Sequence, residues 1–222
     1  HLAGKGDIVP SIQKPSNYFQ TNVQGTINVL ECCRNFKVKK IIYAASSSCY
    51  GIAKTPTSEK NKINTKYPYA LSKYLGEKCV SHWSKIYKLP FISIRIFNAY
   101  GPRVKTTGVY GALFGVLFKQ KLLSKPFTVV GDGKQKRDFL YVTDVANAFY
   151  KSAITNIKNE IFNLGSGKPI SVLEIVYLIG GKIIFVPRRP GEPDITHANI
   201  TKIKKKLKWS PKISIRQGVK TM

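Results

Sequence analysis

The sequence predicts an α/β protein built on a parallel sheet, and the main evidence is the alternation of short apolar runs with helical patterns. Residues 39–48 ("KKIIYAASSS") and 90–98 ("PFISIRIFN") are apolar runs of strand length. The stretch 15–36, which lies before the first of them, repeats apolar residues at helical spacing. Parallel sheets are made of strands that alternate with helices in this way.

The same two patterns continue to the C-terminal part of the chain. We expect helices at 15–36, from Pro68 onward, and at 110–123, 141–153 and 171–180, and strands at 39–48, 90–98, 126–133, 160–167 and 182–187. Pro68 favours a helix start, because proline is suited to the first helical position. "GSGKP" at 165–169 resembles a phosphate loop, but Phe162 and Pro169 occupy two of its required positions. We therefore predict a turn there, and another at 131–133.

Composition excludes several classes of protein. A chain of 222 residues with 43% hydrophobic residues can bury one substantial core. No apolar run approaches the roughly 20 residues that span a bilayer, and "HLAGKGDIVP" does not have the pattern of a signal peptide. The four cysteines form no CxxC pair and no metal-ligand spacing with the three histidines. We expect no metal site and a reducing, cytoplasmic location.

The formal charge of +26 is the most unusual feature of the composition. Such a charge could indicate binding to nucleic acid or to an anionic membrane. However, the lysines are spread along the whole chain, and the densest run, 202–208, keeps Ile203 and Leu207 at helical spacing. This pattern is typical of a solvated surface helix. We expect no specific nucleic-acid partner and no membrane insertion.

Three tyrosines precede a lysine by four residues, a spacing that places both side chains on one helix face. The pairs are Tyr50–Lys54, Tyr69–Lys73 and Tyr74–Lys78. A tyrosine that transfers protons needs a nearby positive charge to lower its pKa and a hydroxyl group to orient the reacting oxygen. Ser46 ends the strand before the helix of Tyr69, where open α/β sheets bind ligands. We therefore predict a site at Ser46, Tyr69 and Lys73, and packing roles for the other two tyrosines and for Trp83 and Trp209.

Eight stretches in order resemble the motifs of the extended short-chain dehydrogenase/reductases, in their NAD-dependent epimerase/dehydratase branch. They are "HLAG" (1–4), "NVQGT" (22–26), "AASSSCYG" (44–51), "YALSK" (69–73), "RIFNAYGPR" (95–103), "GDGKQKRDFLYVTDVANA" (131–148), "NLGSGKPISVLE" (163–174) and "RRPGEPD" (188–194). One match would be weak evidence, whereas eight collinear matches over nearly the whole chain are strong. The resemblance is greatest to UDP-glucose 4-epimerase-like nucleotide-sugar epimerases.

The resemblance implies a Rossmann-like, doubly wound parallel sheet with a smaller C-terminal α/β substrate-binding part. Residues 1–100 would be the remainder of the NAD-binding domain, and residues 101–222 would be mostly substrate-binding, with some segments returning to the sheet. Family members begin with a glycine-rich strand–turn–helix, and no GxGxxG follows a predicted strand here. We therefore expect that the first βαβ units, roughly 60–80 residues, are absent, and the activity of this chain by itself stays open.

The resemblance also implies a mechanism for the predicted site. Tyr69 takes a proton from a sugar hydroxyl as its carbon gives hydride to NAD+, and Ser46 hydrogen-bonds the same oxygen. Lys73 holds the nicotinamide ribose and lowers the tyrosine pKa. The 4-keto sugar turns over, and hydride returns to its other face, so NAD is regenerated. By the same carry-over, further cofactor contacts are expected from Ala3, Asn22, Ala44 and Phe97, with Asn22 either beside the cofactor or bracing a strand.

The nucleotide-sugar substrate is expected to contact Ser46 and four further residues. By resemblance these are Asn98, Arg137, Arg189 and Glu192. Planar guanidinium groups suit diphosphate recognition. Asn98 could instead cap a strand-to-turn transition, and Arg137 could instead pair with Asp138 or Asp144. Asp144 itself is expected to cap or brace its helix.

Other activities and another class of protein stay open at this stage. Dehydratases of the family have an Asp-Glu pair after the catalytic serine, where this chain has Ser47 and Ser48. Epimerase is therefore preferred over dehydratase, reductase and decarboxylase. A non-catalytic basic binding module is the alternative from a different class. We also expect a homodimer, and the sequence does not identify the sugar or the nucleotide base.

Overall fold

The core of the protein is a parallel three-stranded sheet, as predicted. The computed structural model describes residues 1–106, 113–187 and 193–222. The sheet has the order β1–β2–β7, with β1 at Ile41–Ser46, β2 at Phe91–Ile96 and β7 at Glu160–Leu164. Ser46 lies beside Ile96, and Ile96 beside Leu164, so the carboxyl ends of the strands meet at one edge. Residues 160–164 thus complete a sheet that begins more than one hundred residues earlier.

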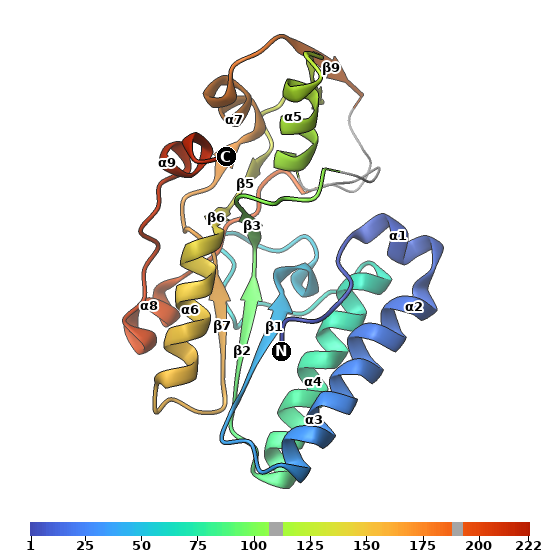
Figure 1. The fold of residues 1–222 in the computed structure, drawn as a ribbon, viewed down its shortest axis with the longest axis vertical. Helices are drawn as coiled ribbons and strands as arrows, with labels where there is room; N and C mark the ends of the chain where they lie inside the picture. The colour runs from blue at the N-terminus through green and yellow to red at the C-terminus, as the bar shows by residue number, and fades with distance from the viewer. Residues whose placement is uncertain (107–112, 188–192) are drawn as a thin grey trace.

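Helices cover both faces of this sheet (Figure 1). On one face lie α3 (Gly25–Asn35) and α4 (Pro68–Tyr87), and on the other lie α6 (Val142–Ile154) and α8 (Thr201–Leu207). Strands buried on both faces read as near-continuous apolar runs, which explains why β1 and β2 were predictable. The lysine-rich helix α8 buries Ile203 and Leu207 against the core, as its spacing predicted.

The N-terminal helix differs from the prediction. In place of one helix over 15–36, the chain forms α1 (Ile8–Gln13), α2 (Pro15–Phe19), a π-helical turn η1 (Gln20–Gln24) and then α3. The π-turn contains Asn22, whose carbonyl accepts a hydrogen bond from the Thr26 hydroxyl at 2.7 Å. A side chain that enters the helical hydrogen-bond ladder is a known cause of such an interruption.

Short elements make up most of the remaining chain, and the sequence did not predict most of them because they are too short to show a period. Three two-stranded sheets pair β3 (Asn98–Tyr100) with β6 (Phe139–Tyr141), β4 (Phe127–Val130) with β9 (Ile183–Val186), and β5 (Lys136–Arg137) with β8 (Ile170–Ser171). The helices α5 (Leu113–Leu122), α7 (Val172–Ile179) and α9 (Ile215–Lys220) and the 3-10 turn η2 (Ser47–Tyr50) complete the described elements.

The two strands beyond the main sheet that were predicted, β4 and β9, pair with each other instead of joining that sheet. Gly131 and Gly133 form the predicted turn after β4 with φ of 60° and 73°. Asp144 braces the structure, since its Oδ2 accepts hydrogen bonds from the backbone N–H groups of Lys212 and Ile213. Trp209 is buried in the core under the main sheet, as predicted.

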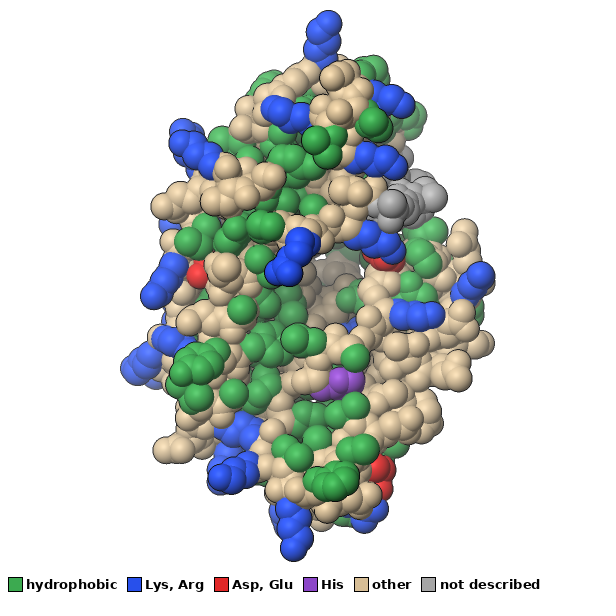
Figure 2. Space-filling model, in the orientation of Figure 1, with side chains coloured by type: hydrophobic (Ala, Val, Ile, Leu, Met, Phe, Trp, Pro, Cys, Tyr) green, Lys and Arg blue, Asp and Glu red, His purple; other side chains and the backbone are tan. Residues whose placement is uncertain are grey.

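Among the described residues, no helix is long and apolar enough to cross a membrane. The same residues contain no group of three or more His, Cys, Asp or Glu side chains that could hold a metal ion. Figure 2 shows one face of the molecule, where Lys and Arg side chains are scattered singly and the surface is hollowed near its middle.

Candidate active site

Ser46 and Tyr69 are brought together at the carboxyl end of β1. Ser46 is the last residue of the strand, and Tyr69 lies in the first turn of α4. The Tyr69 hydroxyl donates a hydrogen bond to Ser46 Oγ at 3.2 Å. Ser46 Oγ also accepts from the backbone N–H of Ser48, which fixes the serine rotamer. The strand end and the helix start, both predicted from the sequence, thus place two reactive hydroxyls in contact.

The other two Tyr–Lys pairs do not face this serine. Tyr50 is buried and its hydroxyl lies 2.7 Å from both Asn163 Oδ1 and Arg95 Nη1. Tyr74 has its ring beside the Lys78 ammonium, 5.4 Å from the ring centroid. Tyr50 therefore does more than pack, since it carries hydrogen bonds in the protein interior. Among the three tyrosines, it is Tyr69 that contacts Ser46.

Lys73 is buried although it carries a charge. Its side chain is 8% exposed, and its Nζ lies 4.7 Å from the centroid of the Tyr43 ring. Within residues 1–106, 113–187 and 193–222, the ammonium has no hydrogen bond and no ion pair. Burial lowers the Lys73 pKa to about 8, and the Glu77 carboxylate one helical turn away acts in the opposite direction. The ammonium therefore has N–H groups available for a ligand.

The pKa of Tyr69 differs from the expectation. Burial raises it above the ordinary value of a phenol, and the hydrogen bond with Ser46 opposes the rise. The sequence analysis expected Lys73 to lower this pKa. The difference arises because desolvation of the phenolate is the largest effect, and the Lys73 ammonium lies over Tyr43.

A groove of about 240 Å³ opens in front of these side chains, and we call it the active-site groove. It is lined by Leu2, Gly4, Lys5, Gly6, Ala44, Ala45, Ser46, Tyr69, Lys73, Ile96, Phe97 and Ala99. The predicted cofactor contacts Ala44 and Phe97 are among these residues. Ala3 is exposed between two lining residues and does not line the groove itself.

The groove leaves open space beside the Lys73 ammonium. A Cβ atom at Gly4 would lie 3.5 Å from Lys73 Nζ and 3.1 Å from Asn22 Oδ1, so glycine keeps the space beside the ammonium open. A ribose hydroxyl is an acceptor of the kind that an ammonium with available N–H groups can bind. Lys73 would hold the ribose, and Ala44 and Phe97 would supply apolar contacts to the nicotinamide.

Asn22 braces the groove from behind. It is fully buried, and its side chain accepts from the Lys5 N–H at 2.7 Å and donates to the Lys5 carbonyl at 3.0 Å and to Ser72 Oγ at 2.9 Å. These bonds tie the N-terminal segment to α4. A contact with the cofactor and the bracing of a strand both stay predictions for Asn22. Tyr18, which the sequence analysis missed, hydrogen-bonds the Gly6 carbonyl and packs edge-on against the Tyr69 ring. The sequence signal was its spacing, because Tyr18 lies four residues before Asn22 and therefore on the same helix face.

The predicted substrate contacts are placed only in part. Asn98 Nδ2 donates to the Asp138 carbonyl and to Thr196 Oγ1, both at 3.2 Å, so Asn98 ties β3 to two other segments. Arg137 Nη1 donates to the Pro193 carbonyl at 2.8 Å. Pro193 lines a second cavity of about 270 Å³ next to the turn after β4. Arg189 and Glu192 lie outside the described residues.

The carboxylates considered as alternative partners of Arg137 are engaged elsewhere. Asp138 accepts from the Ser166 and Ala198 N–H groups, and Asp144 accepts from the 212–213 backbone. Arg137 and Asp138 are adjacent in the sequence but make different contacts. Arg137 donates to the Pro193 carbonyl, and Asp138 accepts from backbone N–H groups.

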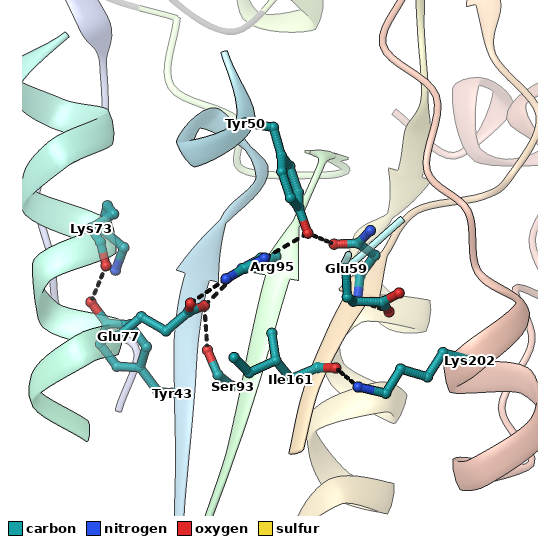
Figure 3. Close-up of polar contacts among 10 residues, drawn as sticks. Tyr43, Tyr50, Glu59, Lys73, Glu77, Ser93, Arg95, Ile161 and Lys202 are labelled. Atoms are coloured by element: carbon teal, nitrogen blue, oxygen red, sulfur yellow. Dashed lines mark hydrogen bonds and ion pairs between the residues drawn. The ribbon is translucent and has the colours of Figure 1, made fainter. Parts of the chain in front are cut away.

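A buried polar network lies behind the site, and sequence reasoning missed it (Figure 3). Arg95 on β2 makes two hydrogen bonds to the Glu77 carboxylate on α4, at 2.9 and 2.5 Å, and Ser93 adds a third at 2.9 Å. The Arg95 guanidinium also donates to Tyr50, which in turn bonds Asn163 on β7. A charged residue in the middle of the apolar run "FISIRIF" was the available signal for this pairing.

The parallel sheet, with helices on both faces and a polar cluster at its strand ends, is that of the Rossmann-like α/β proteins. The model of the NAD-dependent epimerase/dehydratase family matches residues 1–165. The chain belongs to that family.

Similar proteins of known name are consistent with this assignment. A putative UDP-glucose 4-epimerase of Methanocaldococcus jannaschii is 35% identical, with 99% of this chain and 73% of the relative aligned. A UDP-glucuronate 4-epimerase of Thermodesulfobacterium geofontis is 34% identical over 99% of this chain and 69% of the relative. The crystal structure of UDP-glucose 4-epimerase from Thermotoga maritima with UDP-glucose superposes with a TM-score of 0.94 at 30% identity, over 100% of this chain and 74% of that one.

Proposed function

We propose that the protein is an NAD-dependent nucleotide-sugar 4-epimerase that acts on a UDP-sugar. The observation that carries the proposal is the Tyr69–Ser46 hydrogen bond at the mouth of a groove that also holds Lys73. The names of the relatives support the same activity, since they include UDP-glucose and UDP-glucuronate 4-epimerases. A Bacillus cereus UDP-glucuronic acid 4-epimerase, solved with UDP-glucuronic acid and NAD, has a TM-score of 0.89 at 32% identity.

In this proposal each side chain has one task. Tyr69 accepts the proton of the sugar C4 hydroxyl, and Ser46 donates a hydrogen bond to the same oxygen. Lys73 donates hydrogen bonds to the nicotinamide ribose, and its positive charge favours the phenolate form of Tyr69 once substrate is in place. NAD, when bound, supplies the acceptor and then the donor of the hydride. The proton on Tyr69 returns to the sugar oxygen at the end of the cycle.

The division of the chain follows from the same proposal. Residues 1–100 carry the cofactor side of the site, and residues 101–222 carry most of the substrate side, with β7 in the main sheet. Arg137 and Arg189 would contact the diphosphate, Asn98 the sugar or diphosphate, and Glu192 the ribose of the nucleotide. The second cavity, bounded by Lys136 and Asp194, gives room for a ligand beside Arg137.

We also propose that the protein is a cytoplasmic homodimer. All four cysteines are unpaired, which suits a reducing compartment. The ends of α3 and α4 expose Phe36, Ile86 and Tyr87, and apolar side chains at adjacent helix ends are suited to contact with a second copy. Sedimentation at micromolar concentration would detect the dimer, and a monomer at that concentration would contradict it.

The test of the reaction is to incubate the protein with NAD and, in turn, UDP-glucose, UDP-N-acetylglucosamine and UDP-glucuronic acid, and to follow the sugars by NMR. The chain of 222 residues is assayed beside a fusion that carries the glycine-rich NAD-binding segment of a relative. A C4 epimer from either form would support the proposal and name the substrate. A fusion that binds NAD and leaves all three sugars unchanged would contradict it and favour a reductase or decarboxylase.

A further inference from the structure

The surroundings of the Lys73 ammonium raise a question that the proposed function does not answer. A buried ammonium is costly unless nearby groups compensate for the water that it loses. The charged or titratable groups near it are Tyr69 and Glu77 on α4, Tyr43 on β1, Arg95 on β2, and Lys5 and Asp7 on the N-terminal segment. Of these, the Glu77 carboxylate raises the pKa of Lys73, against the effect of burial.

Glu77 compensates for part of this burial, although its carboxylate is bonded to other groups. It accepts two hydrogen bonds from Arg95 and one from Ser93, and both members of the Glu77–Arg95 ion pair are almost fully buried. The carboxylate is thus held by Arg95 and is not in direct contact with the Lys73 ammonium. Figure 3 shows Glu77 directed toward Arg95.

Tyr43 is the group in direct contact with the ammonium. The face of an aromatic ring is electronegative and attracts a cation within about 6 Å of its centroid, and here the separation is 4.7 Å. Tyr43 is fully buried in β1, so the ring is desolvated as well, which strengthens the attraction.

The position of the Tyr43 ring is fixed by two further contacts. Its hydroxyl donates to the backbone carbonyl of Lys73 at 3.3 Å, across the gap between β1 and α4. At Gly76, one turn further along α4, an added Cβ would lie 2.3 Å from the same hydroxyl oxygen. Glycine at this helix position thus leaves the room that the tyrosine hydroxyl occupies, and the ring is held under the lysine that it contacts.

We infer that Tyr43 is a positioning residue for Lys73. The Tyr43 ring holds the Lys73 ammonium in its charged form and directs it into the active-site groove. The inference rests on the proposed function for the role of Lys73, but the contact itself can be tested without turnover. Tyr43 would act through the face of its ring, with the hydroxyl serving only to fix the ring. Phenylalanine should therefore replace it, and an aliphatic side chain should not.

The primary experiment measures how the acetylation rate of Lys73 depends on pH in the chain of 222 residues, with each lysine resolved by mass spectrometry. The wild-type midpoint is expected near 8. Tyr43→Phe should keep that midpoint, whereas Tyr43→Leu should lower it by about half a unit or more, because the charged form loses its aromatic neighbour. Equal midpoints in the two variants would overturn the inference.

A control variant separates this effect from loosening of the fold. Phe162→Leu removes another buried ring that contacts a lysine, Lys202, away from the groove, and should leave the Lys73 midpoint unchanged. Thermal unfolding of each variant confirms that it is folded.

A second readout uses whichever form of the protein turns over UDP-sugar. The fall in kcat/KM at high pH should begin at lower pH in Tyr43→Leu than in the wild type, and Tyr43→Phe should restore the profile. If the wild type produces no epimer, the proposed function fails, while the acetylation result still decides the inference. If the wild type is active and the two Tyr43 variants share one pH profile, the inference fails alone.

Discussion

Near Lys73, polar side chains on long helices and strands are held by hydrogen bonds to other side chains. Near Asp138, a single carboxylate accepts hydrogen bonds from backbone N–H groups of separate short segments. Glu77 and Arg95 join α4 to β2 through a two-point ion pair. Asp138 is also fully buried, but it accepts from the N–H groups of Ser166, Gly167 and Ala198. The first arrangement joins a helix to the main sheet, and the second holds together loops of the C-terminal part of the chain.

This difference bears on function because the two regions do different work in the proposed reaction. Groups that transfer protons must be held to within a fraction of an ångström, which favours rigid elements. Groups that recognise a substrate can be carried on loops, which are free to vary. The following predictions test whether the two regions separate in this way, beginning with the largest expected effect.

Tyr69→Phe should have the largest effect of all on turnover. Loss of the phenolic hydroxyl removes the proton acceptor, and general base catalysis is worth about 10²–10⁴-fold in rate. UDP-sugar affinity should stay near the wild-type value, because the ring is retained. Turnover by NMR and affinity by calorimetry check both statements. Tyr74→Phe is the matched control on the same helix, and a similar loss in both variants would remove Tyr69 as the base.

Arg95→Met should destabilise the protein by about 3–5 kcal/mol, because it leaves the Glu77 carboxylate buried without its cation. Tyr50 would lose its charged donor in the same variant. Urea denaturation measures the change. The control is Arg34→Met, which removes an exposed ion pair with Glu31 and should leave the free energy of unfolding almost unchanged. Equal effects would mean that the buried pair does not hold α4 to the sheet.

How far the sequence predicted this site depends on the kind of interaction involved. The Ser46–Tyr69 contact was predictable, because a strand end and a helix start each have local signals. The parallel sheet was predictable, since apolar runs indicate buried parallel strands, but the order of its strands was not predicted. The Glu77–Arg95 pair was not found, although a lone arginine in an apolar strand indicates a buried partner.

The remaining errors concern interactions that have no local pattern. The pKa of Tyr69 is raised and not lowered, since burial in the folded protein outweighs a charge that spacing alone suggested. The strand pairs β3–β6 and β5–β8 join residues far apart in the chain, and their two or three residues show no period. Asp138 was noted only as a partner for Arg137, because its backbone donors come from loops that only the folded chain brings together.

Asp138→Ala should destabilise the protein by about 2–4 kcal/mol, since it leaves buried N–H groups of two segments without an acceptor. It should also weaken UDP-sugar binding, because Ala198 and the neighbouring segment would move. Chemistry on bound substrate should change less than binding. Urea denaturation and calorimetry give the two quantities. Glu31→Ala, which removes a carboxylate from an exposed ion pair on α3, is the control; it should cost far less stability and leave the affinity unchanged. A larger loss in turnover than in affinity would contradict the separation of the two regions.

Arg137→Ala should have the smallest effect on stability and a selective effect on affinity. Its guanidinium donates to the Pro193 carbonyl at the rim of the second cavity, and it is only partly buried. A charge-assisted hydrogen bond to a diphosphate is worth about 1.5–3 kcal/mol, so the UDP-sugar Kd should rise roughly 10- to 100-fold with kcat little changed.

Arg216→Ala, an exposed arginine on α9, is the matched control for general loss of positive charge. If both variants weaken binding equally, the effect belongs to the overall charge of +26 and not to a diphosphate contact. Raising the salt concentration also distinguishes the effect of overall charge from that of a direct contact. A long-range field is screened within about 10 Å at 0.1 M ionic strength, whereas a direct contact is screened much less. A difference between the two variants that persists in salt would place Arg137 against the substrate, in the short strand β5 and away from the main sheet.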